Sequence, residues 1–257
     1  MIEEIEKIIN EFKGFSQVRA IAIGGSSTSK MSDKLSDIDT YVFVENDISV
    51  KDRENLIKKY STKYEAGGEY FGSGDEFMAD AIGKQFDVMY WNTDWFESVV
   101  TNVWEKHYPS NGYTTCFLYT LKNFDIKYDK TEWLKGLRDK LNSPYPQELK
   151  ENIIKRNMML MKDKPFASYY EQIEKAVKRG DKNSINHRIS AFMASYFDVI
   201  FAKNELLHPG EKRLVQFALK NCKILPNDFE ENVEKLYGED DKPAVLNVMF
   251  ENLKEIL

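Results

Sequence analysis

The chain has 257 residues, of which 36 are lysine or arginine and 42 are aspartate or glutamate, giving a formal net charge of −6. Apolar residues at 42% and charged residues at 30% are typical of a globular chain and exclude an intrinsically disordered one. The acidic balance argues against a dedicated nucleic-acid binder, whose surface is usually basic.

The N-terminus is acidic and amphipathic, without the basic stretch and the apolar core of a signal peptide. No apolar run reaches the length of about 20 residues that spans a bilayer. The two cysteines, Cys116 and Cys222, lack metal-type spacing, and we expect them to be reduced, buried thiols. These features predict a cytoplasmic protein with no membrane partner, present as a monomer or a homodimer.

The first half of the chain alternates between helical and strand patterns. Helices are recognised by apolar residues at helical spacing, and strands by short apolar runs that end at glycine or polar residues. The predicted elements are a helix over 2–13, strands over 18–23 and 40–44, a helix over 50–60, a strand over 63–71 broken at Gly67-Gly68, a turn over 72–75, a strand over 85–91, and a helix that begins at Thr93 or Asp94 and runs to about residue 106.

Beyond about residue 130 nearly every segment has helical periodicity. The segment 184–207 carries the wide apolar face of a bundle helix. We therefore predict an α+β fold with an N-terminal mixed-sheet domain over 1–130 and a C-terminal helical bundle over 131–257. The bundle helices are predicted over 147–161, 166–179, 184–207, 211–221, 228–237 and 242–256.

Two carboxylates, Asp37 and Asp39, lie one residue apart at the start of an apolar strand. Side chains at i and i+2 of a strand point to the same face, so both carboxylates project together while Ile38 points into a core. Two carboxylates at such a short separation repel each other unless a cation lies between them. Oxygen ligands of this kind suit magnesium, which fills its remaining positions with water and phosphate oxygens.

A loop rich in glycine and hydroxyl residues precedes this strand. Gly24-Gly25 follows an apolar strand, and a glycine pair lets the backbone approach a ligand closely. Backbone N–H groups, the hydroxyls of Ser26 and Ser27, and Lys30 could hold phosphate oxygens. The loop matches neither the Rossmann pattern nor the Walker A pattern.

Together, Gly25, Ser26, Asp37 and Asp39 resemble the nucleotidyltransferase signature of the DNA polymerase-β superfamily. That signature is Gly-Ser after a strand, followed by an Asp-x-Asp strand. A third carboxylate occurs on a later strand in this superfamily, and Asp87 fits that place. The chain has Ser29-Lys30 where many members have an Arg-Gly pair, a departure that leaves the subfamily open.

The resemblance implies a mechanism. Two magnesium ions would be held by Asp37, Asp39 and Asp87, and Ser26 would contact the terminal phosphates of ATP or another nucleoside triphosphate. An acceptor hydroxyl would attack the α-phosphorus and release pyrophosphate. Asp87 would lie nearest the acceptor and assist its deprotonation. The product would be a nucleotidyl ester, most simply an adenylyl ester.

A helical bundle after the catalytic sheet resembles the small nucleotidyltransferases that modify aminoglycoside or lincosamide antibiotics. This resemblance implies that residues 131–257 bind a small hydroxyl-bearing acceptor, with antibiotics among the candidates. The turn over 208–213 supplies Lys212, which would neutralise triphosphate charge or would lie in an exposed interhelical turn. The segment 67–80 is acidic and aromatic, and it suits a cationic small molecule as well as a plain exposed turn.

Two other functions stay open at this point. Antitoxin-like members of the superfamily adenylylate a partner protein, although those members are shorter and pair with a separate helical partner. A non-catalytic, nucleotide-binding regulatory module could keep the same fold. A polymerase acting on nucleic acid is disfavoured because the chain has no basic stripe.

Overall fold

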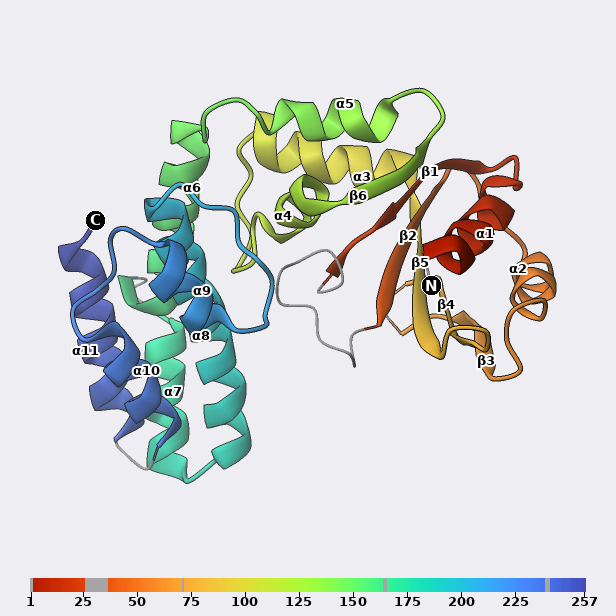
Figure 1. Cartoon of the computed structure of the whole chain (residues 1–257). Helices are drawn as coiled ribbons and strands as arrows, with labels where there is room; N and C mark the ends of the chain where they lie inside the picture. Colours follow the sequence, from red (N-terminus) through yellow and green to blue (C-terminus); the bar gives the residue numbers. More distant parts are fainter. Residues whose placement is uncertain (1, 26–36, 71, 164–165, 239–240) are drawn as a thin grey trace. The chain divides into compact units, whose positions relative to one another are not determined.

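The structure, a computed structural model, describes residues 2–25, 37–70, 72–163, 166–238 and 241–257 (Figure 1). The chain forms two compact units. We call residues 1–101 with 120–143 the sheet unit, and residues 102–119 with 144–257 the helical unit. The α+β fold class predicted from the sequence is confirmed.

The division between the units differs from the predicted one at residue 130. Residues 102–119 group with the helical unit, although they precede that position. Residues 131–143 stay with the sheet unit, because strand β6 (Asp125–Asp129) pairs with the first strand and helix α5 (Trp133–Lys140) follows β6 directly. The chain therefore enters the helical unit, returns to complete the sheet, and leaves it again.

One sheet runs through the sheet unit (Figure 1). The first five strands are β1 (Val18–Ile23), β2 (Ile38–Val44), β3 (Tyr64–Gly68), β4 (Gly74–Ala79) and β5 (Lys84–Asn92). Among the described residues the strand order is β3-β4-β5-β2-β1-β6. Strands β2 and β5 are parallel, and the other neighbouring strands are antiparallel.

Two strands were not predicted from the sequence. The segment 72–75 was expected to be a turn, but Gly74 and Asp75 open strand β4. Glycine, aspartate and glutamate are uncommon in strands, so local propensity conceals this one. Strand β6 was expected to be only a junction, yet it pairs along β1 and forms one edge of the sheet.

One face of the sheet carries an apolar core beneath α1 (Ile2–Lys13) and α2 (Val50–Ile57). Helix α1 contributes a stripe at helical spacing, as the sequence predicted. Alternate residues of β2 and β5 complete this core, which is why their burial alternates along the strand. Its fully buried members include Ile8, Phe12, Ile21, Val42, Ile57 and Phe86.

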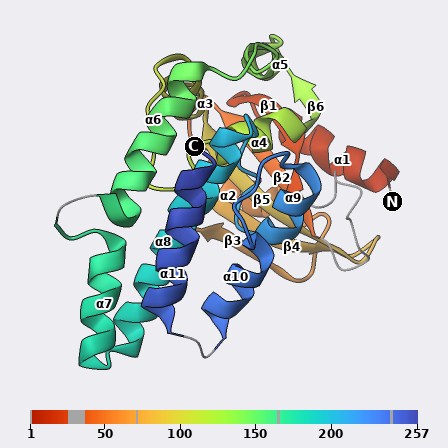
Figure 2. The ribbon, with the colours of Figure 1, turned by 90° about the vertical axis from the view of Figure 1, so that its left-hand side faces the viewer.

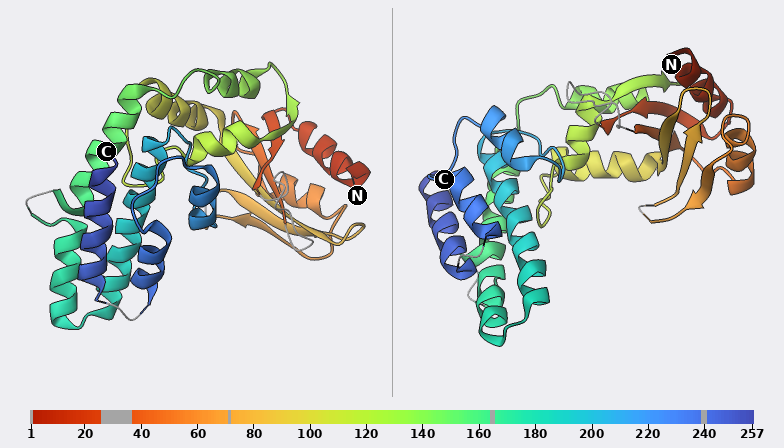
Figure 3. Two further views of the ribbon diagram at one scale, coloured as in Figure 1. Left: turned by 60° about the vertical axis from the view of Figure 1, so that its left-hand side comes forward. Right: turned by 60° about the horizontal axis from the view of Figure 1, so that its bottom comes forward.

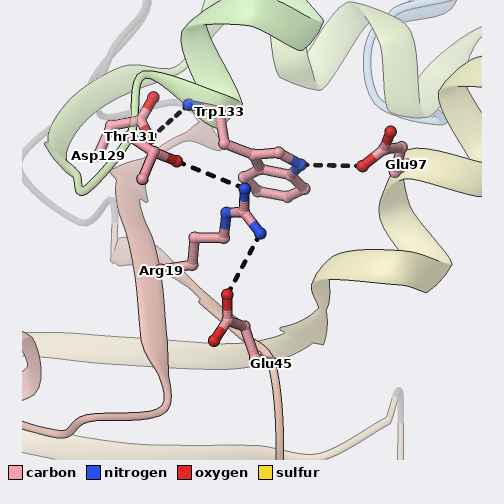
Figure 4. A network of polar contacts seen from close by, with 6 residues as sticks. All are labelled: Arg19, Glu45, Glu97, Asp129, Thr131 and Trp133. Carbon is pink, nitrogen blue, oxygen red and sulfur yellow. Dashed lines mark hydrogen bonds and ion pairs between the residues drawn. The ribbon is translucent and has the colours of Figure 1, made fainter.

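The opposite face is held at one end by a cluster of polar and aromatic contacts (Figure 4). Arg19 of β1 forms an ion pair of 3.2 Å with Glu45 and lies over the ring of Trp133, 5.4 Å from its centroid. The Trp133 indole N–H donates to Glu97 at 3.0 Å, and its backbone N–H donates to Asp129 at 2.9 Å. These contacts join α5 to β1 and to α3 (Thr93–Val100), which begins after the N-cap Asn92.

The helical unit has its own apolar core, built around α8 (Lys182–Lys203). Helices α7 (Tyr169–Arg179), α8 and α11 (Lys242–Glu255) run side by side in this bundle (Figures 2 and 3). In the described part of the chain no helix has both the length and the apolar character to cross a membrane. The remaining helices are α4 (Cys116–Asn123), which joins the two units, α6 (Gln147–Met158), α9 (Leu214–Asn221) and α10 (Phe229–Tyr237), with π-helical turns at Thr101–Glu105 and Met159–Asp163.

Both cysteines are free thiols, as the sequence predicted. They are half-buried and not fully buried. Burial raises the pKa of Cys116 and raises the pKa of Cys222 to about 11, so both thiols stay protonated at neutral pH.

Candidate functional site

The parallel pairing of β2 and β5 places two predicted site residues next to each other. Asp39 and Asp87 are direct partners in the ladder, so their side chains leave the same face of the sheet from adjacent strands. Adjacent strands lie about 4.8 Å apart. Asp37 lies directly before β2, two residues before Asp39, and all three aspartates are half-buried.

The glycine turn after β1 lies against Asp39. The Gly24 N–H donates to the Asp39 carbonyl at 2.9 Å, extending the β1–β2 ladder beyond the strand end. Gly25 has a positive φ of 68°, and a Cβ built there would lie 1.6 Å from Asp39 Oδ2. Only a residue without a side chain can bring the backbone this close to the carboxylate, so the turn and the aspartate form one site.

The strand register adds two carboxylates that sequence reasoning did not assign to the site. Glu65 of β3 pairs with Glu76 of β4, and Glu76 pairs with Asp87. We call Glu65, Glu76, Asp87 and Asp39 the carboxylate row, since they are consecutive partners across β3, β4, β5 and β2. The sequence predicts a turn or loop around Glu76, and only the pairing of β4 with its neighbours aligns these side chains.

The pKa of Glu76 responds both to burial and to the charges around it. Partial burial and the charges of Asp87, Glu65 and Asp37 raise the pKa of Glu76, in that order of importance. The Gln85 amide donates to Asp87 Oδ1 at 2.8 Å. Within the described residues, no lysine or arginine forms an ion pair with Glu65, Glu76 or Asp87. The row is therefore a concentration of negative charge on one sheet face.

The donor set fits magnesium in its chemistry. Carboxylate oxygens are the ligands that magnesium prefers, and the ion commonly takes only one or two of them from the protein. No group of three or more His, Cys, Asp or Glu side chains within the described ranges is arranged to hold a metal ion. Asp39 and Asp87 provide two adjacent carboxylates without such a three-residue cluster, and metal binding by Asp37, Asp39 and Asp87 stays a prediction.

The remaining predicted phosphate ligands are placed as follows. Ser26, Ser27 and Lys30 lie outside the described residues. Lys212 belongs to the helical unit and is exposed, in the turn before α9. Its contact with a triphosphate stays a prediction.

The turn over 208–213 is not simply an exposed interhelical turn, because His208 is fully buried. Its backbone N–H donates to Thr115 Oγ1 at 2.8 Å, and its Nδ1 accepts from the Gly210 N–H at 3.2 Å. Its ring contacts Tyr113 and Phe201 at centroid distances of 4.6 and 5.0 Å. Burial lowers the pKa of His208 to about 3, so its imidazole is neutral and anchors the turn.

The acidic, aromatic segment 67–80 is also more structured than its composition suggests. Asp75 is fully buried and pairs with Arg53 at 3.6 Å. It accepts from the Tyr90 hydroxyl at 2.6 Å and from the Gly67 N–H at 2.8 Å. Asp75 is therefore a structural residue that fixes the β3–β4 hairpin, and it is not available to a cationic ligand.

Comparison with known proteins gives distant likenesses. Residues 114–214 match a domain of unknown function, DUF4037. The chain is similar to a nucleotidyltransferase-like protein from Exiguobacterium sibiricum 255-15, at 9% identity and a TM-score of 0.48, covering 99% of this chain and 73% of that one. It is also similar to a STING-associated CdnE c-di-GMP synthase from Capnocytophaga granulosa, at 14% identity and a TM-score of 0.32, covering 99% of this chain and 78% of that one. No curated protein matches.

Proposed function

We propose that the sheet unit transfers a nucleoside monophosphate, AMP from ATP, to a hydroxyl group of a small-molecule acceptor and releases pyrophosphate. The observation that carries this proposal is the close approach of the Gly25 turn to Asp39, together with the ladder pairing of Asp39 with Asp87. A phosphate held by the turn would lie beside both carboxylates, which is the arrangement that the signature in the sequence implies.

The residues have separate proposed roles. Asp37, Asp39 and Asp87 would hold magnesium. When bound, this ion would neutralise charge on the triphosphate and lower the pKa of the acceptor hydroxyl. The backbone at Gly25, with Ser26, Ser27, Lys30 and Lys212, would bind the β- and γ-phosphates. The helical unit would bind the acceptor. These assignments of phosphate ligands and acceptor come from the sequence resemblance.

The proposed reaction is a substitution at the α-phosphorus. The acceptor oxygen forms a bond to this phosphorus, and the bond from the phosphorus to the bridging oxygen of the β-phosphate breaks. The electron pair of the broken bond leaves with pyrophosphate. The proton of the hydroxyl passes to the Asp87 carboxylate, whose orientation is fixed by the Gln85 amide at 2.8 Å.

The test measures pyrophosphate release from ATP with Mg²⁺ across a panel of hydroxyl compounds that includes hydroxyl-bearing antibiotics. We expect at least one acceptor to support release, and Asp39→Asn to abolish it. Asp47→Asn is the matched control, because Asp47 is exposed and follows the same strand. Equal activity in wild type and Asp39→Asn would reject the catalytic role.

Two further readouts separate the proposal from its alternatives. Transfer of labelled AMP to protein, with no small-molecule product, would favour a protein-adenylylating enzyme. ATP binding without any product would favour a regulatory module. Magnesium binding is measured independently of activity, as the shift of the thermal unfolding midpoint with Mg²⁺, which Asp39→Asn should reduce and Asp47→Asn should not.

A further inference from the structure

An aromatic surface lies next to the carboxylates on the same face of the sheet. Tyr41 follows Asp39 by two residues on β2, and Trp91 follows Asp87 by four on β5. The rings of Tyr41 and Trp91 touch edge to face with centroids 4.7 Å apart, and Trp95 of α3 touches Trp91 at 5.5 Å. We call Tyr41, Trp91 and Trp95 the aromatic shelf.

The shelf lies on the accessible face of the two strands. Along β5 the residues on the core side are buried, whereas Asp87, Met89 and Trp91 are half-buried. Along β2 the same contrast separates the buried Thr40 from Asp39 and Tyr41. Trp95 is 41% exposed, a high value for a residue that usually buries most of its surface. A half-buried strip therefore runs from the carboxylates onto the aromatic rings, and on β2 it ends at Tyr41, because Phe43 on the same face is fully buried.

The positions of these rings are fixed by packing. Besides Trp91, the Tyr41 ring contacts Phe124, whose ring centroid is 4.8 Å from its own. A Cβ built on Gly24 would lie 2.7 Å from the Tyr41 ring, so the glycine turn and the ring are in direct contact. The backbone N–H of Trp95 donates to the N-cap Asn92 at 3.0 Å, which fixes the start of α3. Rings held in this way bind a ligand without a large loss of side-chain entropy.

We propose that the aromatic shelf stacks on the nucleobase of the nucleotide, an inference that rests on the proposed function. The step from Asp39 to Tyr41 is two residues, about 7 Å along the strand. A single ribose separates a nucleobase from its α-phosphate, a distance on the same scale. A nucleotide whose α-phosphate lies at Asp39 and Asp87 would therefore place its planar ring at the level of Tyr41. Trp95, which contacts Trp91 beside Tyr41 and is 41% exposed, would offer the open ring surface for stacking. Stacking of this kind tolerates different bases, so the shelf selects a planar ring and not one particular base.

The experiment compares ATP with inorganic triphosphate, because the two share the phosphates and differ in the ring. Binding of each, with Mg²⁺, is measured by calorimetry and by quenching of tryptophan fluorescence. We expect ATP to quench the emission and triphosphate to leave it unchanged. Trp95→Leu should weaken ATP binding by about tenfold and leave triphosphate binding unchanged. Trp133→Phe is the matched control, since Trp133 lies in the same unit and outside the shelf.

The outcomes separate this inference from the proposed function. If ATP binds wild type and Trp95→Leu equally well, the shelf has no role in binding while the proposed function stands. If Trp95→Leu weakens ATP and triphosphate equally, the change acts through the fold and the inference is overturned. If the tryptophan fluorescence is quenched by an acceptor and not by ATP, the shelf binds the acceptor, and the inference is overturned too. If wild type binds neither ATP nor triphosphate, the proposed function fails and the shelf has no nucleotide to bind.

Discussion

Gly25 and Asp39 are in such close contact that a methyl group on Gly25 would lie 1.6 Å from Oδ2 of the Asp39 carboxylate. The turn that ends β1 is therefore shaped around the aspartate on β2. Since Asp39 is in turn the ladder partner of Asp87, a change at residue 25 displaces one end of a connected set of groups. This connection makes the glycine a sensitive probe of the candidate site.

Gly25→Ala should abolish nucleotide transfer, because the new methyl group displaces the Asp39 carboxylate. The matched control is Gly83→Ala in the same unit. Gly83 also has a positive φ, of 59°, but a Cβ there has no neighbour within 4 Å. Both changes should cost about 1 kcal/mol of stability from the strained backbone, and only Gly25→Ala should lose activity. Transfer activity that survives in Gly25→Ala would contradict the proposed site; thermal unfolding and pyrophosphate release measure the two effects.

The carboxylate row should destabilise the folded protein in the absence of metal. Like charges directly opposite each other on neighbouring strands repel, so Glu65→Gln should raise the free energy of unfolding by a few tenths of a kcal/mol. The gain should shrink at high salt, because the charges are screened. Glu3→Gln is the control, and it should lower the free energy of unfolding slightly, since Glu3 forms an exposed ion pair with Lys7. A stability loss in Glu65→Gln, measured by urea unfolding, would show that the row is not repulsive.

The sequence was sufficient for the elements whose signal is local. Strands β1, β2 and β5 have apolar runs, α1 and α8 have helical periodicity, and all of them lie close to the predicted ranges. The sequence predicts that Asp37 and Asp39 share one face of a strand, because they are two residues apart at the start of an apolar run; Asp39 lies in β2, and Asp37 directly precedes that strand. The glycine pair Gly24-Gly25 indicates a backbone that can approach a ligand, and the resemblance to a known signature joins it to the aspartates and adds Asp87.

What the sequence could not provide is the pairing between strands. Glu65 and Glu76 join the carboxylate row only through the order β3-β4-β5-β2, and no periodicity within one strand specifies its neighbours. The buried pair of Arg53 and Asp75 is a similar case. Charged residues are almost never fully buried unless paired, and the partner here is 22 residues away in sequence.

Asp75→Ala should destabilise the sheet unit by about 3–5 kcal/mol, because it leaves the Arg53 charge buried without its partner. The guanidinium also lies over the Tyr90 ring, 4.4 Å from its centroid, and cannot turn to solvent without disturbing the core. Asp80→Ala is the control, since Asp80 is exposed and accepts only the Thr62 N–H from the described residues. The measurement is the urea unfolding midpoint. A cost near 1 kcal/mol would mean that water reaches Arg53 after the change.

The helical unit should show opposing effects of pH from two buried groups. The pKa of His208 is lowered to about 3 in the folded protein, from 6.5 in the unfolded chain. The unfolded chain therefore binds the extra proton, and stability falls as the pH drops from 6.5 towards 3. Asp198 accepts from Thr114 and Asn157, and burial raises its pKa from 3.8 to about 6. Its contribution is present at low pH and is lost as the pH rises towards 6, so the two effects partly cancel between pH 4 and 6.

Single variants should remove one effect each. The variant His208→Phe keeps a ring between Tyr113 and Phe201. When the pH is lowered from 6.5 to 4, this variant should lose less stability than wild type, by up to about 1.4 kcal/mol for each pH unit. In Asp198→Asn the same loss should steepen, because the opposing group is gone. His187→Gln is the control, since His187 is exposed on α8. Urea unfolding between pH 4 and 7 measures all four proteins, and parallel pH profiles for wild type and His208→Phe would show that the His208 imidazole gains a proton inside the folded unit.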